Sequence, residues 1–478
     1  MSSPLGDLDV ETFRGAAHRV VDWMADYLAH PERHPVLSRA EPGDVRRTLP
    51  RHPPAGAEPI DEILADVDRV IMPGITHWNN PAFFAYFAIS GSAPGILGEM
   101  ISAALNVNAM LWKTSPAATE LEEVVLEWLR EMMGLPNEWF GVITDTASIS
   151  TLLALAAARE APVELAIRER GMAGRADLPV MRVYCSDQAH SSVDKAAITL
   201  GLGYENVTRV ASDDAFRMRA DLLERAMAED VAAGRRPLAV VATTGTTSTT
   251  SIDPVRAIAA VCKRYGAWLH IDAAYGGAAA TAPEMRWVLD GAELADSLVV
   301  NPHKWLFTPV DCSALYARDG DTLKRAFALV PEYLATARQG QVVDFMDYGV
   351  QLGHRFRALK LWMVIRAFGA EGIAARVREH CALARELASW IESEPDWQLS
   401  APVPLSVVCF RHVPRATMTA EELDAHNERI MHQVNASGEA YLSHTKLRGA
   451  RVLRIAIGHL RTERRHVARA WALLKACT

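Results

Sequence analysis

The sequence predicts an α/β fold built on a mainly parallel β-sheet that binds ligands at the carboxyl ends of its strands. Two observations support this prediction. Across residues 141–316, short apolar runs alternate with alanine-rich segments of helical periodicity, the pattern of a sheet covered on both faces. Polar residues capable of chemistry follow directly after several of these runs. The candidate strands are 181–185, 238–243, 268–271 and 298–300, and candidate helices between them are 149–159 and 215–228.

Length and composition restrict the class of protein. A chain of 478 residues, half of them hydrophobic and 23% charged, predicts a globular protein of two or three structural units. The net charge of -8 argues against a nucleic-acid or anionic-membrane partner, and no apolar run approaches the roughly 20 residues of a membrane span. The N-terminus lacks a signal-peptide pattern, and the six cysteines are scattered without CxxC, so we expect a cytoplasmic protein without a metal site.

The N-terminal segment is predicted to be a helical arm. Apolar residues at helical spacing, including Val20, Trp23 and Leu28, predict a helix over 10–29, followed by a proline-rich, extended connector over 38–59. A helix on such a connector cannot easily bury its own apolar side. Packing of this arm against a partner subunit is our hypothesis.

Two further segments lie before the alternating region. Residues 76–89 are rich in aromatic side chains, which serve either as core or as the wall of a site for an aromatic ligand. Thr119 and Glu122 have capping-box spacing, so we expect a helix to begin there and to end at Gly134.

The C-terminal part is predicted to be a smaller α+β unit. Helical periodicity runs from residue 352 to about 391. Apolar strands are predicted near 405–411 and 452–457, and a last helix from Thr462.

Lys304 is the first candidate for chemistry. It lies in Asn301-Pro302-His303-Lys304-Trp305, straight after the apolar run 298–300. A lysine held in the interior there has the lowered pKa that suits formation of a Schiff base. Taken alone, a surface lysine at a strand end is the commoner case.

Other candidates follow neighbouring strands. Thr146, Ala147 and Ser148 open a predicted helix, where hydroxyl and backbone donors suit a phosphate, although serine and threonine are also ordinary helix caps. Asp272 ends an apolar strand, where its carboxylate could keep a cofactor's pyridine nitrogen protonated, cap a helix or make a structural ion pair. His190 follows the strand 181–185 and could stack on such a ring or cap a helix. Turn chemistry alone explains 244–247, which also follow a strand. Together these residues predict a pyridoxal 5'-phosphate (PLP) site at one edge of the sheet.

Several motifs resemble those of the aromatic L-amino-acid decarboxylases, the PLP-dependent group II decarboxylases and their aldehyde-synthase variants. They are Gln188-Ala189-His190-Ser191-Ser192, His270-Ile271-Asp272-Ala273-Ala274-Tyr275, Asn301-Pro302-His303-Lys304-Trp305 and Arg355-Phe356-Arg357-Ala358-Leu359-Lys360, with Thr76-His77-Trp78, Phe83-Phe84-Ala85-Tyr86-Phe87 and the stretch 115–122. The resemblance implies a fold-type-I, PLP-dependent transferase-like fold with a seven-stranded sheet flanked by helices. It also implies a homodimer. Its parts would be an N-terminal helical dimerisation arm (1–85), a large PLP-binding α/β domain (86–355) and a small α+β domain (356–478).

The resemblance also implies a role for each site residue. Lys304 would carry PLP as a Schiff base, Asp272 would pair with the pyridine nitrogen, His190 would stack on the ring, and Ala274 would lie beneath it. The remaining cofactor-binding candidates are Thr146, Ala147, Ser148, Thr246, Ser297, Asn301 and His303. The substrate-binding candidates are Trp78, Tyr86, Phe87 and Ile89, with Met110 from the partner subunit.

The sequence departs from its family at Phe345. Counted back from Arg355, this is the position where decarboxylases carry a tyrosine that donates a proton to the substrate carbanion. Family members without that tyrosine let the carbanion react with dioxygen, and they form an aldehyde, ammonia and hydrogen peroxide. Tyr348, three residues later, would be an alternative donor, and so would water or His190. The sequence thus predicts decarboxylation to an arylethylamine, with oxidative conversion to an arylacetaldehyde as the alternative.

A second departure concerns the substrate. Ile89 lies where many members have a hydroxyl residue near the substrate ring, and an isoleucine cannot hydrogen-bond a catechol. This disfavours DOPA and leaves phenylalanine, tyrosine and tryptophan open. An aminotransferase, or a non-catalytic homologue that serves as a binding protein, is less consistent with the motifs.

Overall fold

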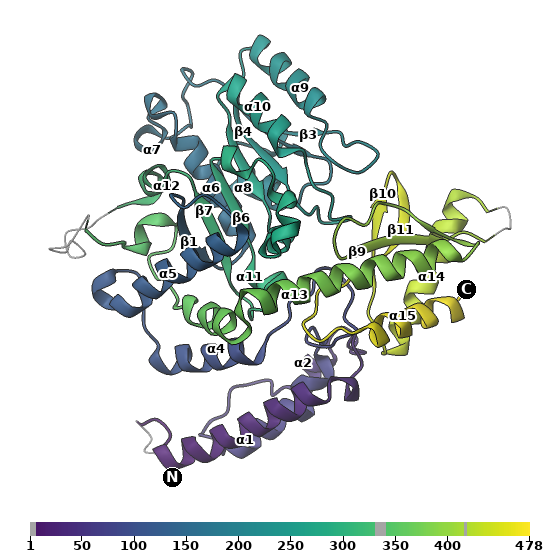
Figure 1. The fold of residues 1–478 in the computed structure, drawn as a ribbon. Coiled ribbons are helices and arrows are strands. Elements are labelled where there is room, and N and C mark those ends of the chain that lie inside the picture. Colours follow the sequence, from purple (N-terminus) through teal and green to yellow (C-terminus); the bar gives the residue numbers. More distant parts are fainter. Residues whose placement is uncertain (1–5, 330–340, 415–417) are drawn as a thin grey trace.

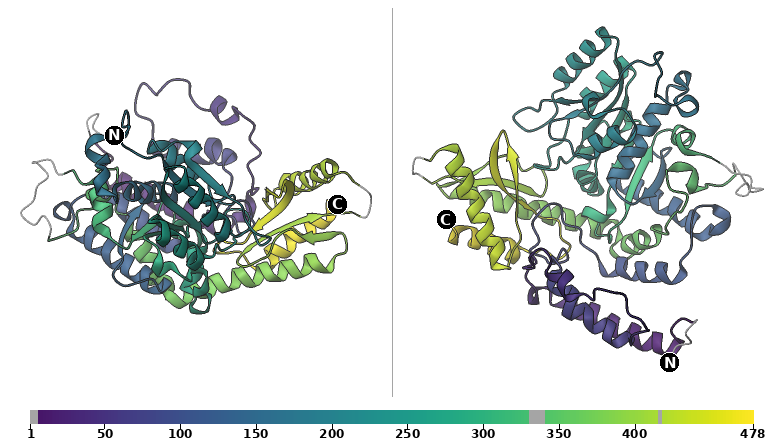
Figure 2. Two further views of the ribbon diagram at one scale, coloured as in Figure 1. Left: turned by 90° about the horizontal axis from the view of Figure 1, so that it is seen from above. Right: turned by 180° about the vertical axis from the view of Figure 1, so that it is seen from behind.

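The computed structural model describes residues 6–329, 341–414 and 418–478. An arm of helices stands below a large α/β body, and a smaller α+β unit lies beside that body (Figure 1). The long helix α13 runs along the base of the body and into the small unit, and this helix connects the two (Figures 1 and 2).

Within the described residues, seven strands form the sheet of the large body in the order β1-β7-β6-β5-β4-β2-β3. Strands β2 to β6 pair in parallel, whereas β7 runs antiparallel to both of its neighbours. The predicted mainly parallel sheet is therefore confirmed, and the four predicted strands agree with β2, β4, β5 and β6 to within two residues at each end. The strands are β1 Phe140–Thr144, β2 Met181–Ser186, β3 Val207–Val210, β4 Arg236–Thr243, β5 Trp268–Asp272, β6 Ser297–Val300 and β7 Ser313–Ala317.

Both faces of this sheet are buried, as the continuous apolar strands require. In β4, Val240 and Ala242 belong to the core that includes Ile258 of α10, whereas Ala239 and Val241 belong to the core that includes Leu155 of α6. Alternate side chains of one strand thus enter two cores, one on each face. The helices of the body are α4 Ala93–Leu105, α5 Pro116–Met133, α6 Ala147–Glu160, α7 Ile167–Arg170, α8 Ser192–Thr199, α9 Ala220–Ala232, α10 Val255–Tyr265, α11 Pro302–Trp305 and α12 Gly320–Phe327.

Three predicted helix starts were wrong, and one of them is that of α13, which begins at Ala358 and not near residue 352. Helix α5 begins at Pro116, not Thr119, because the hydroxyl of Ser115 accepts the N–H of Ala118 and caps the helix three residues earlier. Helix α9 begins at Ala220, because Asp213 holds the preceding residues in a turn by accepting the backbone N–H groups of residues 215 and 217. Apolar periodicity does not separate such a turn from the first turn of a helix.

The small unit has an antiparallel sheet in the order β10-β11-β9-β8, packed against helices. Its predicted strands and last helix are present, and α13 is bent at Gly369, where φ is +66°. The elements are α13 Ala358–Ser393, β8 Trp397–Leu399, β9 Val407–His412, α14 Ala420–Ser437, β10 Ser443–Leu447, β11 Ala450–Ala456 and α15 Arg464–Ala476.

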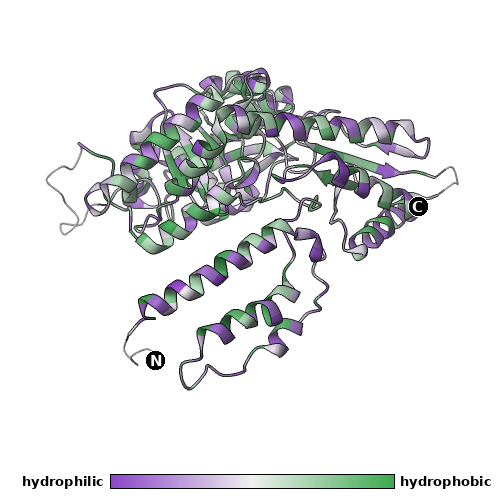
Figure 3. Ribbon diagram, turned by 60° about the horizontal axis from the view of Figure 1, so that its bottom comes forward, coloured by the Kyte–Doolittle hydropathy of each residue, from purple (hydrophilic) through white to green (hydrophobic). Residues whose placement is uncertain are grey.

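The arm consists of α1 Val10–Ala29, α2 Asp44–Thr48 and α3 Ile60–Asp66. Helix α1 has its predicted bounds, but the predicted extended connector contains the short helix α2. The arm stands away from the body, and α1 shows both apolar and polar residues along its length (Figures 1 and 3). Val10 and Phe13 are 68% and 61% exposed, so much of the apolar surface of α1 is uncovered in the single chain. Among the helices of the described ranges, none has both the length and the apolar content needed to cross a membrane.

Candidate active site

The carboxyl ends of the parallel strands meet at a cavity of about 400 Å³. Strand β5 ends at Asp272, β4 ends at Thr243, and the turns after β6 and β2 carry Lys304 and His190. All four residues line the cavity. The sheet topology therefore assembles the predicted residues at one edge, as expected for an open α/β sheet.

Lys304 is held by the one-turn helix α11. Its backbone N–H donates to the carbonyl of Asn301 (2.9 Å), and its Nζ lies 5.3 Å from the centre of the Phe87 ring. Burial lowers the pKa of this amine, and the negative charge of Asp272 opposes that effect. A buried amine with a lowered pKa spends more time as the neutral nucleophile that a Schiff base requires.

Asp272 and His190 are fixed by local backbone contacts. The carboxylate of Asp272 is buried and accepts the N–H of Ala274 at 3.1 Å. The Nδ1 atom of His190 accepts the N–H of Ser192 at 3.1 Å, so a neutral imidazole carries its proton on Nε2. Burial lowers the pKa of His190, while the charge of Asp272 acts in the opposite direction.

A group of donors and unpaired polar atoms lies around the start of α6 and the end of β6. Thr146, Ala147 and Ser148 open α6 and line the cavity together with Asn301 and His303. The side-chain oxygen of Asn301 is buried and has no hydrogen-bond partner within the described chain. Burial lowers the pKa of His303 to about 3, and its Nδ1 accepts the N–H of residue 312 (2.9 Å), which leaves Nε2 as a neutral donor. A helix N-terminus, hydroxyls and neutral N–H groups suit a phosphate.

These residues fit PLP. The lysine can form a Schiff base with its aldehyde, the carboxylate can hold a proton on the ring nitrogen, and the start of α6 can receive the phosphate. Ala274, whose side chain is a single methyl group, lines the cavity beside Asp272 and leaves room for a flat ring.

Aromatic side chains form one wall of the cavity. Trp78, Tyr86 and Phe87 line it together with Ile89, as the sequence predicted. The ring of Tyr86 lies 5.8 Å from that of Trp78, and its hydroxyl is 3.2 Å from the hydroxyl of Tyr441. Because the backbone of Tyr86 has φ +53°, the chain makes a sharp turn here that sets Tyr86 and Phe87 against different neighbours.

Sequence reasoning missed the contribution of the small unit. Arg454 of β11 lines the cavity, and its guanidinium lies 4.8 Å from the centre of the Phe87 ring while donating to the carbonyls of Tyr86, Thr247 and Ser248. An arginine inside an apolar strand is costly without partners, and that signal could have identified it. The other lining residues that were not predicted are Thr243, Gly245, Thr247, Ser248, Tyr275, Ser443, His444 and Thr445.

Four predicted site residues lie elsewhere in the single chain. Ser297 begins β6, at the end opposite the cavity, and its hydroxyl bonds to His270 and Trp268, so the expectation that it holds the phosphate is corrected. Thr246 is buried and bonds to Thr249 and the N–H of Ser251.

Phe345 and Met110 are also absent from the lining of the cavity in the described chain. Phe345 is 2% exposed and belongs to a core cluster beside α6. The carbonyl of Met110 accepts the N–H of Met346 (3.1 Å), which ties the two segments together. Met110 was predicted to line the substrate pocket of a partner subunit. A single chain does not test this, so it stays a prediction.

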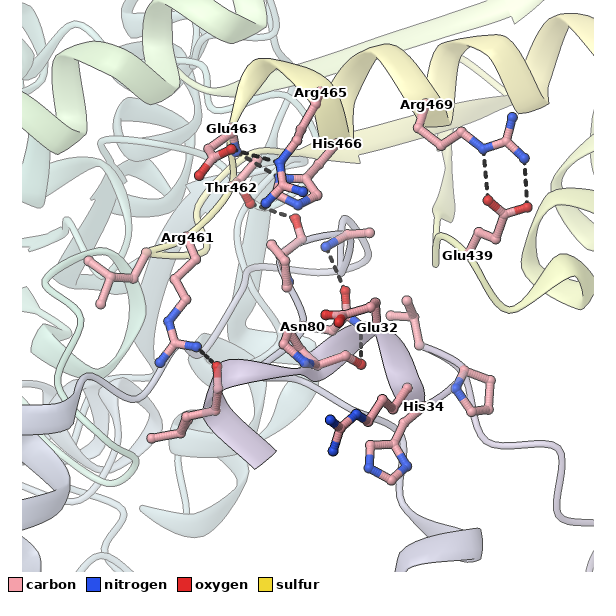
Figure 4. Close-up of a pocket in the computed structure, with 18 of the residues that line it drawn as sticks. Glu32, His34, Asn80, Glu439, Arg461, Thr462, Glu463, Arg465, His466 and Arg469 are labelled. Atoms are coloured by element: carbon pink, nitrogen blue, oxygen red, sulfur yellow. Dashed lines mark hydrogen bonds and ion pairs between the residues drawn. The ribbon is translucent and has the colours of Figure 1, made fainter. Parts of the chain in front are cut away.

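A larger hollow of about 1190 Å³ lies where the arm meets the small unit (Figure 4). Many of its charged side chains are already engaged, since Arg469 pairs with Glu439, Arg465 pairs with Glu463, and Arg461 donates to a backbone carbonyl of α1. No lysine is found among the described residues that line it. The cavity around Lys304 is therefore the candidate active site.

The chain belongs to the pyridoxal-dependent decarboxylase family, whose conserved domain matches residues 42–413. It is 39% identical to phenylacetaldehyde synthase of Arabidopsis thaliana over 98% of this chain and 96% of that protein. It is 40% identical to tryptophan decarboxylase 2 of Oryza sativa subsp. japonica over 98% of this chain and 95% of that protein. The crystal structure of Oryza sativa TDC with PLP and tryptamine superimposes with a TM-score of 0.94 at 37% identity, over 100% of this chain and 99% of that one.

Proposed function

We propose that this protein decarboxylates an aromatic L-amino acid of the phenylalanine, tyrosine or tryptophan class and releases the arylethylamine. The observation that carries the proposal is that Lys304, Asp272 and His190 line the same cavity as the aromatic side chains of Trp78, Tyr86 and Phe87. The relatives named for tryptophan decarboxylation and phenylacetaldehyde synthesis support the same class of substrate.

In this reaction the cofactor would be held by residues of this chain. Lys304 would bind PLP as a Schiff base, Asp272 would keep the ring nitrogen protonated, and His190 would stack on the ring. The phosphate would be held by Thr146, Ala147, Ser148, Asn301 and His303. When bound, PLP supplies an electron sink for the electron pair that remains on the α-carbon as carbon dioxide leaves.

The substrate ring would bind against Trp78, Tyr86 and Phe87, which also keep water from the reacting carbon. Ile89 offers no hydrogen bond to a catechol, so we propose that DOPA is a poor substrate. A proton must then reach the α-carbon. In the cavity of the single chain, His190 is a candidate donor through Nε2, because its Nδ1 is occupied by a backbone N–H.

A second candidate function is favoured by Phe345. A phenyl ring gives no proton, so the electron pair left by the departing carbon dioxide would instead reduce dioxygen, which would then be a co-substrate. The overall reaction balances as amino acid, dioxygen and water giving arylacetaldehyde, carbon dioxide, ammonia and hydrogen peroxide. The two electrons of the bond that breaks as carbon dioxide leaves would reduce dioxygen to peroxide, and water would replace the nitrogen on the α-carbon as ammonia leaves.

One assay tests both candidates. PLP-loaded enzyme is incubated in air with phenylalanine, tyrosine, tryptophan and DOPA, and carbon dioxide, amine, aldehyde and peroxide are measured together. Amine without peroxide supports the decarboxylase, and equal amounts of aldehyde and peroxide support the second candidate. Turnover that requires an oxo acid and releases no carbon dioxide would contradict both.

We also propose that the protein is a homodimer in which the arm covers the partner subunit. The support is the uncovered apolar surface of α1, together with exposed Leu97, Ile101 and Leu105 on α4. Light scattering during size-exclusion chromatography should give twice the chain mass, and deletion of residues 1–35 should shift it toward the monomer. A monomeric full-length enzyme with full activity would contradict the dimer.

A further inference from the structure

A column of stacked rings lies beneath the candidate active site. The ring of Phe87, which lines the cavity, stacks on Tyr275 with centroids 3.9 Å apart. Tyr275 stacks on Trp305 at 4.7 Å, with the two planes 1° apart. Trp305 is the residue after Lys304, so the column connects the aromatic wall of the cavity to the turn that carries the lysine.

The lower end of the column is held by His380 of α13. The indole N–H of Trp305 donates to Nδ1 of His380 at 2.9 Å, and both side chains are buried. Because an indole can only donate, Nδ1 must accept, and the imidazole proton is on Nε2. The imidazole also makes a hydrogen bond with the backbone of His459, and burial lowers its pKa to about 4. His380 is therefore a neutral acceptor in a fixed orientation.

The upper end of the column is held by the small unit. The guanidinium of Arg454 lies over the ring of Phe87, 4.8 Å from its centre, and the hydroxyl of Tyr275 is 2.6 Å from that of Ser406. The rings cannot slide far at this end without breaking those contacts. At the lower end, the hydrogen bond from the indole N–H to His380 is the corresponding anchor.

We propose that His380 is a positioning residue for the reaction: by accepting the indole N–H of Trp305, it sets the column that places Phe87 and the Lys304 turn. In the described chain His380 does not line the cavity, so it acts on the reaction through Trp305. Its other contacts are the edge of the Phe307 ring and the backbone of His459, and neither of these residues lines the cavity. This inference rests on the proposed decarboxylation, and it names a residue outside the cavity on which that reaction depends.

The test is a double-mutant cycle between His380 and Trp305. His380→Leu removes the acceptor with little change in volume, and Trp305→Phe removes the donor but keeps a ring in the column. His380→Asn is the rescue variant, because its amide oxygen can take the place of Nδ1, whereas His380→Gln puts its oxygen farther along the side chain and serves as the matched control. The readouts are kcat and KM, the affinity of the apo-protein for PLP, and the near-ultraviolet circular dichroism of the apo-protein.

We expect His380→Leu to lower kcat by about 10- to 100-fold, as small misplacements of reacting groups do, with less than about a threefold change in KM. PLP affinity and the aromatic circular dichroism should change as well. In the Trp305→Phe background, the same substitution should change each readout by less than about twofold, because the bond is already missing. His380→Asn should recover most of the loss, and His380→Gln should not.

Equal losses from His380→Leu in both backgrounds, or equal behaviour of the Asn and Gln variants, would overturn the inference. If His380→Leu does not fold, Trp305→Phe alone must still lower kcat and weaken PLP binding to the apo-protein, and unchanged values would overturn it equally. The two readouts on the apo-protein do not need turnover. Failure of the proposed function, seen as a wild-type enzyme that decarboxylates no aromatic amino acid, is therefore distinguishable from failure of this inference.

Discussion

The ring of Phe345 lies face to face with the imidazole of His354, with centroids 4.8 Å apart and planes 17° apart. His354 in turn pairs with the buried carboxylate of Glu122 (2.8 Å between Nε2 and Oε2). Phe345 is thus fixed in the core of its own chain and does not reach its own cavity. Residue 345 can take part in catalysis only if its segment moves, or if it contributes to the active site of a partner subunit.

Phe345→Tyr tests that role. A hydroxyl at this position would restore a proton donor, and a positioned general acid contributes about 10²- to 10⁴-fold to proton transfer. We expect the ratio of amine to peroxide to rise at least about 10-fold, or kcat for amine to rise if the wild-type enzyme forms no peroxide. Phe345→Leu is the control, since it alters the packing without adding a donor. No change in ratio or rate with the tyrosine variant would show that position 345 does not supply the proton.

Tyr348 is the alternative donor, and the structure argues against it. Its ring stacks on Phe140 at 4.3 Å, and burial raises the pKa of its hydroxyl to about 12. We expect Tyr348→Phe to leave the ratio of amine to peroxide unchanged within about twofold, because general acids are most effective with a pKa near the working pH. Loss of amine with a matching gain of peroxide would instead identify Tyr348 as the donor.

Lys304→Ala should abolish turnover. The variant lacks the amine that forms the Schiff base, so the absorbance band of that Schiff base should also be lost. Lys263→Ala, on the exposed side of α10, is the control and should retain both. The measurements are carbon dioxide release and the absorbance spectrum of the PLP-loaded proteins. Full activity in the Lys304 variant would refute the site assignment.

Acid should destabilise the fold because of buried neutral histidines. Burial lowers the pKa of His270 to about 4, below the unfolded value of about 6.5. The unfolded chain therefore binds the proton first as the pH falls through 6.5, and the stability of the fold decreases from there down to the folded pKa near 4. We expect a lower urea midpoint at pH 5.5 than at pH 7.5, and a smaller difference in His270→Asn. His52→Asn, at an exposed position, should keep the wild-type difference.

The predictable part of the molecule is the part set by local pattern. Asp272 and Lys304 could be placed because each directly follows an apolar run, and parallel strands bring such ends together. Ser297 was misplaced because it begins its strand, and the direction of the strand puts it at the opposite edge. Arg454 was missed because its contact with Phe87 joins residues more than 360 positions apart, which no local pattern reports. The same holds for His380, since its importance depends on the packing of α13 beneath Trp305.

The segment after β5, at Gly276, lies close against the turn after β4, at Thr244, and this contact gives a last prediction. A Cβ atom on Gly276 would lie 2.4 Å from the carbonyl oxygen of Thr244, and backbone cannot yield as a flexible side chain can. We therefore expect Gly276→Ala to lower the free energy of unfolding by about 1–3 kcal/mol and to weaken PLP binding, because the turn after β4 would be pushed from the cavity. Gly56→Ala is the matched control, since a Cβ there would meet no atom within 4 Å and should change stability by less than about 1 kcal/mol. Urea unfolding and PLP titration of both variants measure these effects. Equal stability of the two variants would mean that the two turns are not in contact. Loss of PLP binding in Gly276→Ala alone would show that the contact between the turns sets the shape of the site.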